Sequence, residues 1–354
     1  MKQNELPRYT ISEHAFSEIP GIISSFGSRA ALITGEKAFA ACGEKLLEAL
    51  KGLEITTHQI YGREASAENI DRLKNIEEIQ NADVIIAAGG GKCLDTAKVT
   101  GDQLGKPVFT VPTIASTCAA VTKIAILHYE NGAFREIYRL KRAPVHCFID
   151  PSVITGAPAE YFWAGMGDTM AKHVECLFSY RNDDPDFEGE YGKTVSVLCY
   201  EPVIRYGKEA YEDVRDHRVS SSVIRIIESI IIATGTVSLS VAPDCNSALA
   251  HALYYGMTVR EWMEYQHLHG EIVSYGTLVQ LMLDHQTEEL KRVYEFNLSV
   301  GLPVCLKDLD LEREDPLEDV IHAAAINQEL DHIPYPITEE MIRQAIEDLE
   351  DYRP

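Results

Sequence analysis

The spacing of hydrophobic residues changes partway along the chain, and this change constrains the fold more than any other feature. Over the first 150 residues, short apolar runs typical of buried strands alternate with amphipathic stretches typical of helices. The strand candidates are 30–34, 55–61, 83–90 and 107–113, and helix candidates between them include 37–52 and 67–80. Such alternation predicts a parallel sheet covered by helices on both faces.

A hairpin is expected to interrupt this alternation. Segments 123–130 and 134–140 flank Asn131-Gly132, a dipeptide that favours a tight turn with positive φ. The apolar run 145–150 then supplies a further strand to the sheet.

Strand patterns stop at about residue 157, and helical spacing follows Pro158, a residue that the first turn of a helix tolerates. We therefore predict an α/β domain over residues 1–157 and an all-helical domain over 158–354. Two domains suit a chain of 354 residues, which is too long for one ordinary core.

The net charge limits the expected binding partners, and the cysteine pattern indicates the cellular compartment. With 32 Lys and Arg against 55 Asp and Glu, the net charge of −23 repels phosphate backbones and anionic lipid, so neither nucleic acid nor membrane is expected as a partner. The eight cysteines form no CxxC pair, which favours reduced thiols in a cytoplasmic protein. Residues 1–16 show no signal peptide, and the apolar stretch 223–242 carries Arg225 and Glu228, so we expect a buried helix there.

A glycine-rich turn follows the strand candidate 83–90. Gly89, Gly90 and Gly91 would let the backbone approach a diphosphate, and the N–H groups of the next helix would point at it. A plain strand-to-helix turn explains three glycines equally well. The segment fits neither GxGxxG nor the P-loop pattern.

The longer pattern is more specific. GGGKCLDTAK at 89–98, followed by VPTIASTCAA at 111–120, resembles the glycerol dehydrogenase branch of the iron-containing alcohol dehydrogenase superfamily, with its GGGKTLDTAK and PTxASTDA motifs. The resemblance covers nearly the whole chain and weakens after about residue 290. It implies a nucleotide-binding, Rossmann-like domain over 1–157 followed by an all-α, metal-binding domain over 158–354, the fold shared with dehydroquinate synthases. It also implies a homo-oligomeric, NAD(P)-linked enzyme acting on the CH–OH group of a small alcohol or polyol.

The resemblance also implies which residues contact the cofactor. In the family the glycines cradle the diphosphate, the Thr and Ser of PTxAST contact the cofactor, and a later Ser or Thr lies near the nicotinamide ribose. The matching positions are Gly89, Gly90, Gly91, Lys92, Asp95, Thr113, Ser116 and Thr122.

Cofactor preference depends on the end of the strand candidate 30–34. Relatives that prefer NAD(H) often have an Asp there, whereas this chain has Gly35 followed by Glu36 and Lys37. Gly35 leaves room for a 2′-phosphate and Lys37 could pair with it, whereas Glu36 argues for NAD(H). The balance leans slightly to NADP(H).

Three further segments match the family's zinc ligands, which come from G-x-x-D, A-x-A-H-A-x-x-x-G and HGE motifs. The matching residues are Asp168, His251 and His269. Three protein ligands leave a coordination position open, as a catalytic zinc needs. Iron-type relatives have a fourth ligand, a His, where this chain has Lys172, which favours Zn²⁺ over iron. His267 matches no family ligand and is expected to lie near the site or at the surface.

One substitution bears on the substrate. The family's aspartate that reaches toward substrate hydroxyls is Cys118 here, and a neutral thiol is a poor acceptor that would not repel an anion. STCAA also resembles a subgroup that acts on 2-oxo and 2-hydroxy acids, such as hydroxycarboxylate dehydrogenases. Sequence drift in a glycerol enzyme explains Cys118 as well, so both substrate classes stay open.

Two other functions are weaker candidates. A dehydroquinate synthase-like lyase would usually continue the glycine turn as GGGVxGDxxG, which this chain does not match. A non-catalytic binding protein would have no need to keep all three matching ligand positions.

Overall fold

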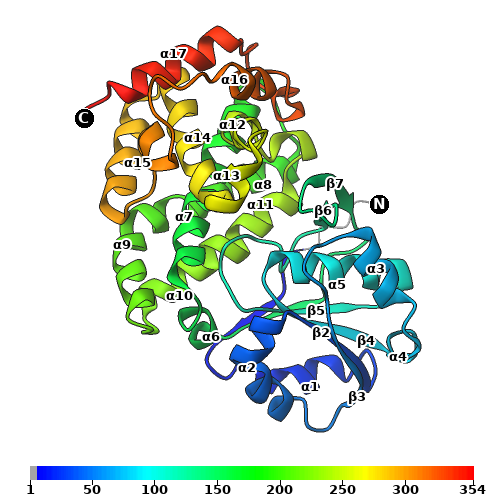
Figure 1. Cartoon of the computed structure of the whole chain (residues 1–354). Helices are drawn as coiled ribbons and strands as arrows, with labels where there is room; N and C mark the ends of the chain where they lie inside the picture. The colour runs from blue at the N-terminus through cyan, green and yellow to red at the C-terminus, as the bar shows by residue number, and fades with distance from the viewer. Residues whose placement is uncertain (1–5) are drawn as a thin grey trace. The chain divides into compact units, whose positions relative to one another are not determined.

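The computed structural model describes residues 6–354 (Figure 1). The expectation about a signal peptide falls partly on residues 1–5, which lie outside the described residues. The chain forms two compact units: one contains the chain up to Pro158 together with Asp213–Ile227, and the other contains Ala159–Glu212 and Glu228–Pro354. The domain boundary between residues 157 and 158 stays a prediction. Asp213–Ile227, which lies beyond this boundary in sequence, clusters with the first unit.

The first unit is built on a six-stranded sheet in which every strand pair is parallel, as the alternating pattern predicted. The strand order is β1-β8-β5-β4-β2-β3. The bounds are β1 (Tyr9–Ile11), β2 (Arg29–Thr34), β3 (Glu54–Ile60), β4 (Val84–Gly89), β5 (Val108–Pro112) and β8 (His146–Ile149). β4 is buried throughout, which explains its uninterrupted apolar run.

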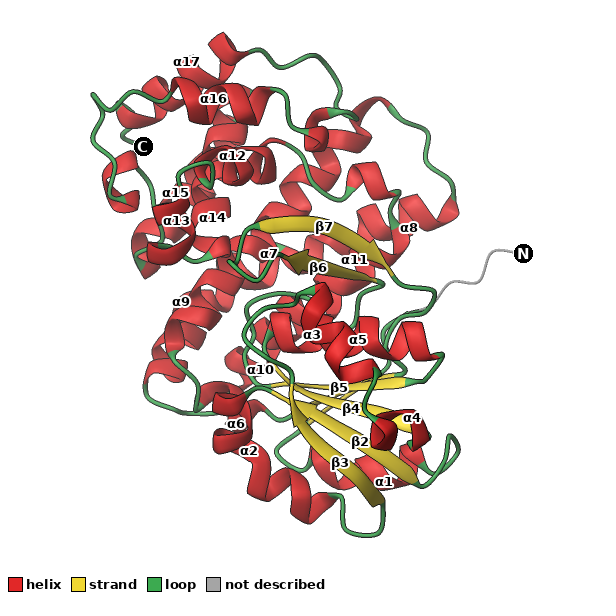
Figure 2. Ribbon diagram, turned by 45° about the vertical axis from the view of Figure 1, so that its right-hand side comes forward, coloured by secondary structure: helices red, strands yellow, loops and turns green. Residues whose placement is uncertain are grey.

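Helices cover both faces of this sheet (Figure 2). One face packs against η1 (Ala15–Glu18), α1 (Ile19–Ile23) and α2 (Glu36–Ala49), and the other is covered by α3 (Ala67–Lys74) and α5 (Gly91–Leu104). The helix expected over 67–80 is split, because α3 ends at Asn75 and α4 (Glu77–Asn81) begins after it. The side chain of Asn75 donates to the carbonyl of Asp71 (2.8 Å), which favours this helix end.

The predicted hairpin forms a separate two-stranded antiparallel sheet of β6 (Ile124–His128) and β7 (Phe134–Arg139). Gly132 in its turn has φ of 90°, which is the conformation that favours glycine. The unit also contains α6 (Pro151–Thr155) and α10 (Ser221–Ile227). His217 Nδ1 lies 2.6 Å from the carbonyl oxygen of Thr155, which ties the segment before α10 to α6.

All described secondary-structure elements of the second unit are helices, as predicted. The main ones are α7 (Ala159–Ser179), α8 (Phe187–Val195), α11 (Thr234–Ser240), α12 (Leu249–Met257), α13 (Glu261–Gln266), α14 (His269–Leu283), α15 (Thr287–Val300), α16 (Glu318–Ala325) and α17 (Glu339–Glu350). The helix α9 (Glu201–Arg215) also begins in this unit, and its residues from Asp213 onward cluster with the first unit. Ser221–Ser240 is long and apolar enough to span a membrane, but 67% of its apolar window is buried, as in the core helix that we expected.

Glycines bring α7, α12 and α14 into backbone contact. A Cβ atom at Gly270 would lie 2.0 Å from the carbonyl oxygen of Ala164, and one at Gly167 would lie 2.4 Å from the carbonyl oxygen of Gly270. A Cβ atom at Gly276 would lie 2.5 Å from the carbonyl oxygen of Ala250. Only glycine permits such close approaches, so these residues fix how the three helices meet.

Candidate metal centre and nucleotide edge

The carboxyl ends of β2 and β4 meet where the strand order changes direction. β3 lies on one side of β2 and β4 on the other, which is the arrangement that opens a ligand crevice in parallel sheets. The backbone N–H of Gly35, after β2, donates to the carbonyl oxygen of Ala88 in β4 (3.2 Å). The structure therefore brings Gly35 together with Gly89–Gly91, as a shared cofactor edge requires.

Close packing explains why two positions of the glycine turn lack a side chain. A Cβ atom at Gly89 would lie 2.6 Å from Cβ of Cys93, and one at Gly90 would lie 2.8 Å from Cδ1 of Ile114. Gly90 is the N-cap of α5 and Gly91 its first residue, so the turn ends at a helix N-terminus. The N–H groups of a first helical turn have no partner inside the helix, which makes this a suitable place for a diphosphate.

Several expected cofactor residues are already engaged inside the unit. The ammonium of Lys92 pairs with Glu64 (2.5 Å). Asp95 is buried, pairs with Lys98 (2.8 Å) and accepts a hydrogen bond from the N–H of Ile126 (3.1 Å). Both side chains therefore have partners within the unit, and their contact with a cofactor stays a prediction.

Lys98 is a residue that sequence reasoning missed. It is 1% exposed, and its ammonium donates to the carbonyl oxygens of Ala119 (2.8 Å) and Ile124 (2.5 Å). Together with Asp95 it anchors the loop that carries several expected site residues. The available signal was a lysine three residues after an aspartate on a helix whose surroundings are apolar.

Of the remaining expected residues of this unit, Thr113 contacts the glycine turn directly. Thr113 follows β5, and its N–H donates to the carbonyl oxygen of Gly89 (3.2 Å). Ser116 and Cys118 are half-buried, and Thr122 is buried. Lys37 is exposed on the first turn of α2.

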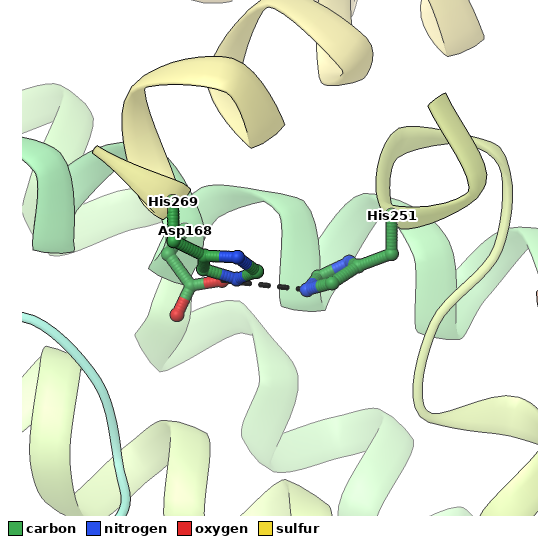
Figure 3. A group of neighbouring side chains, drawn as sticks. All are labelled: Asp168, His251 and His269. Atoms are coloured by element: carbon green, nitrogen blue, oxygen red, sulfur yellow. Dashed lines mark ion pairs between the residues drawn. The ribbon is translucent and has the colours of Figure 1, made fainter. Parts of the chain in front are cut away.

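The three expected metal ligands converge in the second unit (Figure 3). Asp168 comes from α7, His251 from α12 and His269 from the start of α14, and their ligand atoms lie within 4.8 Å of one another. The Nε2 atoms of His251 and His269 are each 3.4 Å from Oδ1 of Asp168. We call this group the Asp168 cluster.

The backbone contacts between helices explain this convergence. Gly167 precedes Asp168, and Gly270 follows His269, so α7 and α14 are in backbone contact beside both ligands. Glu271 fixes the start of α14, because its Oε2 accepts a hydrogen bond from the N–H of Leu268 (3.0 Å). His267 is buried with Nδ1 3.0 Å from Oε1 of Glu271, so it supports this turn and is not part of the cluster.

Glu175 is the second residue that sequence reasoning missed. It is fully buried, and its Oε1 accepts hydrogen bonds from the N–H groups of Ala248 (2.7 Å) and His251 (2.9 Å) at the start of α12. Its Oε2 lies 2.7 Å from Nδ1 of His251. A carboxylate there keeps the proton on Nδ1 and leaves Nε2 free to face Asp168. The signal was a second acidic residue two helical turns after Asp168.

The charges of the cluster suit a divalent cation. Burial alone would raise the pKa of Asp168, but hydrogen bonds from His251 and His269 outweigh it and hold this pKa well below its usual range. Burial disfavours charge on His251 as well, yet Glu175 and Asp168 raise its pKa. With neutral imidazoles, the two buried carboxylates carry two negative charges, which one divalent ion would neutralise. One carboxylate oxygen and two imidazole nitrogens also fit zinc or iron as donors.

Lys172 does not belong to this donor set. Its ammonium donates to the backbone carbonyl oxygen of Asn246 and lies 3.4 Å from the side-chain oxygen of the same residue. The position where iron-type relatives have a fourth ligand is therefore filled by a cation held elsewhere.

Comparisons with known proteins agree with this geometry. Residues 7–151 match the family model of iron-containing alcohol dehydrogenase. The chain is 32% identical to a glycerol dehydrogenase of Thermotoga maritima over 98% of this chain and 95% of that protein. It is 29% identical to hydroxycarboxylate dehydrogenase A of Escherichia coli over 92% of this chain and 90% of that protein. A probable glycerol dehydrogenase structure from Sinorhizobium meliloti superposes with a TM-score of 0.86 at 28% identity, covering 99% of this chain and 98% of the other.

These full-length relatives and the matching motifs place the protein: it belongs to the iron-containing alcohol dehydrogenase family and is a metal-dependent, NAD(P)-linked oxidoreductase that acts on CH–OH groups.

Proposed function

We propose that the chain is a zinc-dependent, glycerol dehydrogenase-like enzyme that transfers hydride between a nicotinamide and a small polyol or hydroxy compound. The observation that carries the proposal is the convergence of Asp168, His251 and His269, with ligand atoms within 4.8 Å of one another. The 32% identity to a glycerol dehydrogenase over nearly the full chain supports it. We further propose a cytoplasmic homo-oligomer, on the strength of the sequence resemblance alone.

Each residue of the proposed site has a defined task. Asp168, His251 and His269 would hold the zinc, and Glu175 keeps Nε2 of His251 free to bind it. Zinc at this place would supply a Lewis acid to stabilise negative charge on the substrate oxygen. Lys172 favours zinc over iron, because an ammonium engaged with Asn246 adds no fourth ligand.

The cofactor edge would bind the dinucleotide mainly through its backbone. Gly89–Gly91 and the N-terminus of α5 would hold the diphosphate. Gly35 adds no side chain at the end of β2, where a Cβ atom would make van der Waals contact with Tyr61 at 3.6 Å. The absence of a carboxylate at Gly35 and the exposed Lys37 in the first turn of α2 favour NADP(H) slightly, although Glu36 in the same turn acts against it.

A second candidate substrate class is the 2-oxo and 2-hydroxy acids. The observation that favours it is Cys118, which replaces a carboxylate that would repel such anions. The similarity to hydroxycarboxylate dehydrogenase A supports it as well.

The direct experiment is a substrate panel of glycerol, propanediols and 2-oxo acids, assayed with both NAD(H) and NADP(H) by absorbance of the reduced nicotinamide. We expect turnover that is lost after exhaustive chelation and restored by zinc. Turnover of none of these substrates by zinc-loaded protein would reject both substrate classes.

A further inference from the structure

A second group of metal-binding side chains lies in the helical unit and shares no residue with the Asp168 cluster. Asp183, Cys245 and His332 each present a ligand atom within 4.8 Å of the others. They come from three separate segments: directly after η2 (Tyr180–Asn182), the end of η5 (Pro243–Cys245), and just after η7 (Gln328–Leu330). We call this group the Asp183 cluster.

Two of its members are held on supports that are fixed by other contacts. Nε2 of His332 lies 2.6 Å from Oδ2 of Asp183. Beside them, the side chain of Asn182 donates to the carbonyl oxygen of Pro334 (3.0 Å), and the ring of Tyr335 packs edge-on against Phe178 at 5.6 Å. These contacts attach the segment around His332 to the end of α7, so the histidine and the aspartate are positioned before any ligand arrives.

The third member, Cys245, belongs to the hydrophobic core of the unit. Cys245 is 2% exposed and packs in a core cluster with Cys176 and Tyr180. The hydroxyl of Tyr180 accepts a hydrogen bond from the N–H of Ala242 (2.8 Å), which fixes the start of η5. Burial raises the pKa of the Cys245 thiol to about 11, so a metal ion would have to displace its proton.

We propose that Asp183, Cys245 and His332 bind a divalent transition-metal ion, preferably zinc. The ion would form a structural site that connects the segment after η7 to the end of α7. A thiolate, an imidazole and a carboxylate are ligands that zinc accepts, and the sulfur selects against magnesium and calcium. Asp183 and His332 are partly open to solvent, so water can complete the coordination. The proposal is independent of the proposed function, since none of these residues belongs to the Asp168 cluster or the cofactor edge.

The same unit contains a matched pair without a thiol. Nδ1 of His322 lies 2.7 Å from Oε1 of Glu339, and both side chains are exposed. Among the described residues no group of metal-ligand geometry includes this pair, so it controls for a histidine–carboxylate ion pair alone. Cys305, which is partly exposed beside Asp308, controls for a cysteine with a carboxylate and no histidine.

The experiment is a titration of the metal-stripped full-length protein with Co²⁺, followed by the near-ultraviolet thiolate-to-cobalt charge-transfer band. The Asp168 cluster has no cysteine, so this band would report the Asp183 cluster. We expect it to saturate after no more than two Co²⁺ per chain, because the Asp168 cluster takes up one ion without contributing a thiolate band. The band should disappear in Cys245→Ser and need at least about tenfold more Co²⁺ in His332→Gln. His322→Gln and Cys305→Ser should leave it unchanged.

Three outcomes would overturn the proposal: no thiolate band at saturating Co²⁺, a band of equal affinity in His332→Gln, or loss of the band in Cys305→Ser. Circular dichroism and dehydrogenase activity, expected to persist in all four variants, show that each one is folded. If Cys245→Ser fails to fold, His332→Gln decides the question, because this side chain is 43% exposed and its replacement leaves the core intact.

Discussion

The cofactor edge of the first unit and the Asp168 cluster of the second are built in opposite ways. The edge uses backbone from a contiguous turn, Gly89–Gly91, whose shape follows from local sequence. The cluster uses side chains from three helices, and their meeting depends on glycine contacts between α7, α12 and α14. The contrast teaches that a change in packing should break the second site while leaving the first one nearly untouched.

Gly270→Ala should have the largest effect. The added Cβ atom would lie 2.0 Å from the carbonyl oxygen of Ala164, so α14 must move away from α7. We expect a loss of stability on the order of 3 kcal/mol by urea denaturation, together with loss of bound metal and activity.

The matched control for this prediction is Gly21→Ala in α1, where a Cβ atom has no neighbour within 4 Å. It should leave metal content unchanged. A Gly270→Ala protein with unchanged stability and metal content would show that the helix contact does not position the ligands.

Glu175→Gln tests the support behind one ligand. The amide would present N–H or oxygen to Nδ1 of His251 without the charge, so the proton on Nδ1 is no longer fixed. We expect zinc affinity, measured by competition with a chelator, to fall by about 10- to 100-fold. Glu160→Gln, at an exposed position on the same helix, should not change it. Equal zinc affinities in the two variants would show that Glu175 does not support zinc binding by His251.

The sequence predicted the architecture well because the strands of the first unit are short, apolar and separated by amphipathic helices. It missed β1 (Tyr9–Ile11), which is three residues long and never fully buried, so it leaves no apolar run. It also missed the end of α3 at Asn75, since a polar side chain that caps a helix looks like any exposed residue.

Residue patterns alone predicted the metal site less completely than the fold. Asp168, His251 and His269 were found through the family resemblance, because their separation in sequence reflects helix packing and not a local motif. Glu175 and Lys98 lay outside the matched ligand and cofactor positions, and their importance appears only from their partners in space.

Cys118→Asp compares the two substrate classes at the cofactor-bearing unit. A carboxylate should repel 2-oxo acids and offer an acceptor to polyol hydroxyls. We expect kcat/KM for 2-oxo acids to fall and that for glycerol to rise, each by about tenfold, equivalent to about 1.4 kcal/mol. Cys118→Ser separates the effect of charge from loss of the thiol. Efficient glycerol turnover by the unmodified protein, with none of 2-oxo acids, would make Cys118 a neutral change.

Gly35→Asp should have the smallest effect. The side chain fits, because a Cβ atom at this position would meet its nearest neighbour, Tyr61, at 3.6 Å. Its charge should shift preference from NADP(H) toward NAD(H) by on the order of 1 kcal/mol in the ratio of kcat/KM values. Gly35→Asn supplies the same shape without charge and should shift it less. Failure of the unmodified protein to use NADP(H) would contradict the expected preference.

The central claim is that Asp168, His251 and His269 hold the metal on which hydride transfer depends. The most direct measurement is zinc content by elemental analysis, together with dehydrogenase activity, for the unmodified protein, Asp168→Ala and His269→Ala. We predict that each variant loses one equivalent of zinc relative to the unmodified protein and loses activity, because two remaining ligands are too few to hold the ion. Exposed His322→Gln should lose neither. Full activity in either ligand variant, or in exhaustively chelated protein, would contradict the claim.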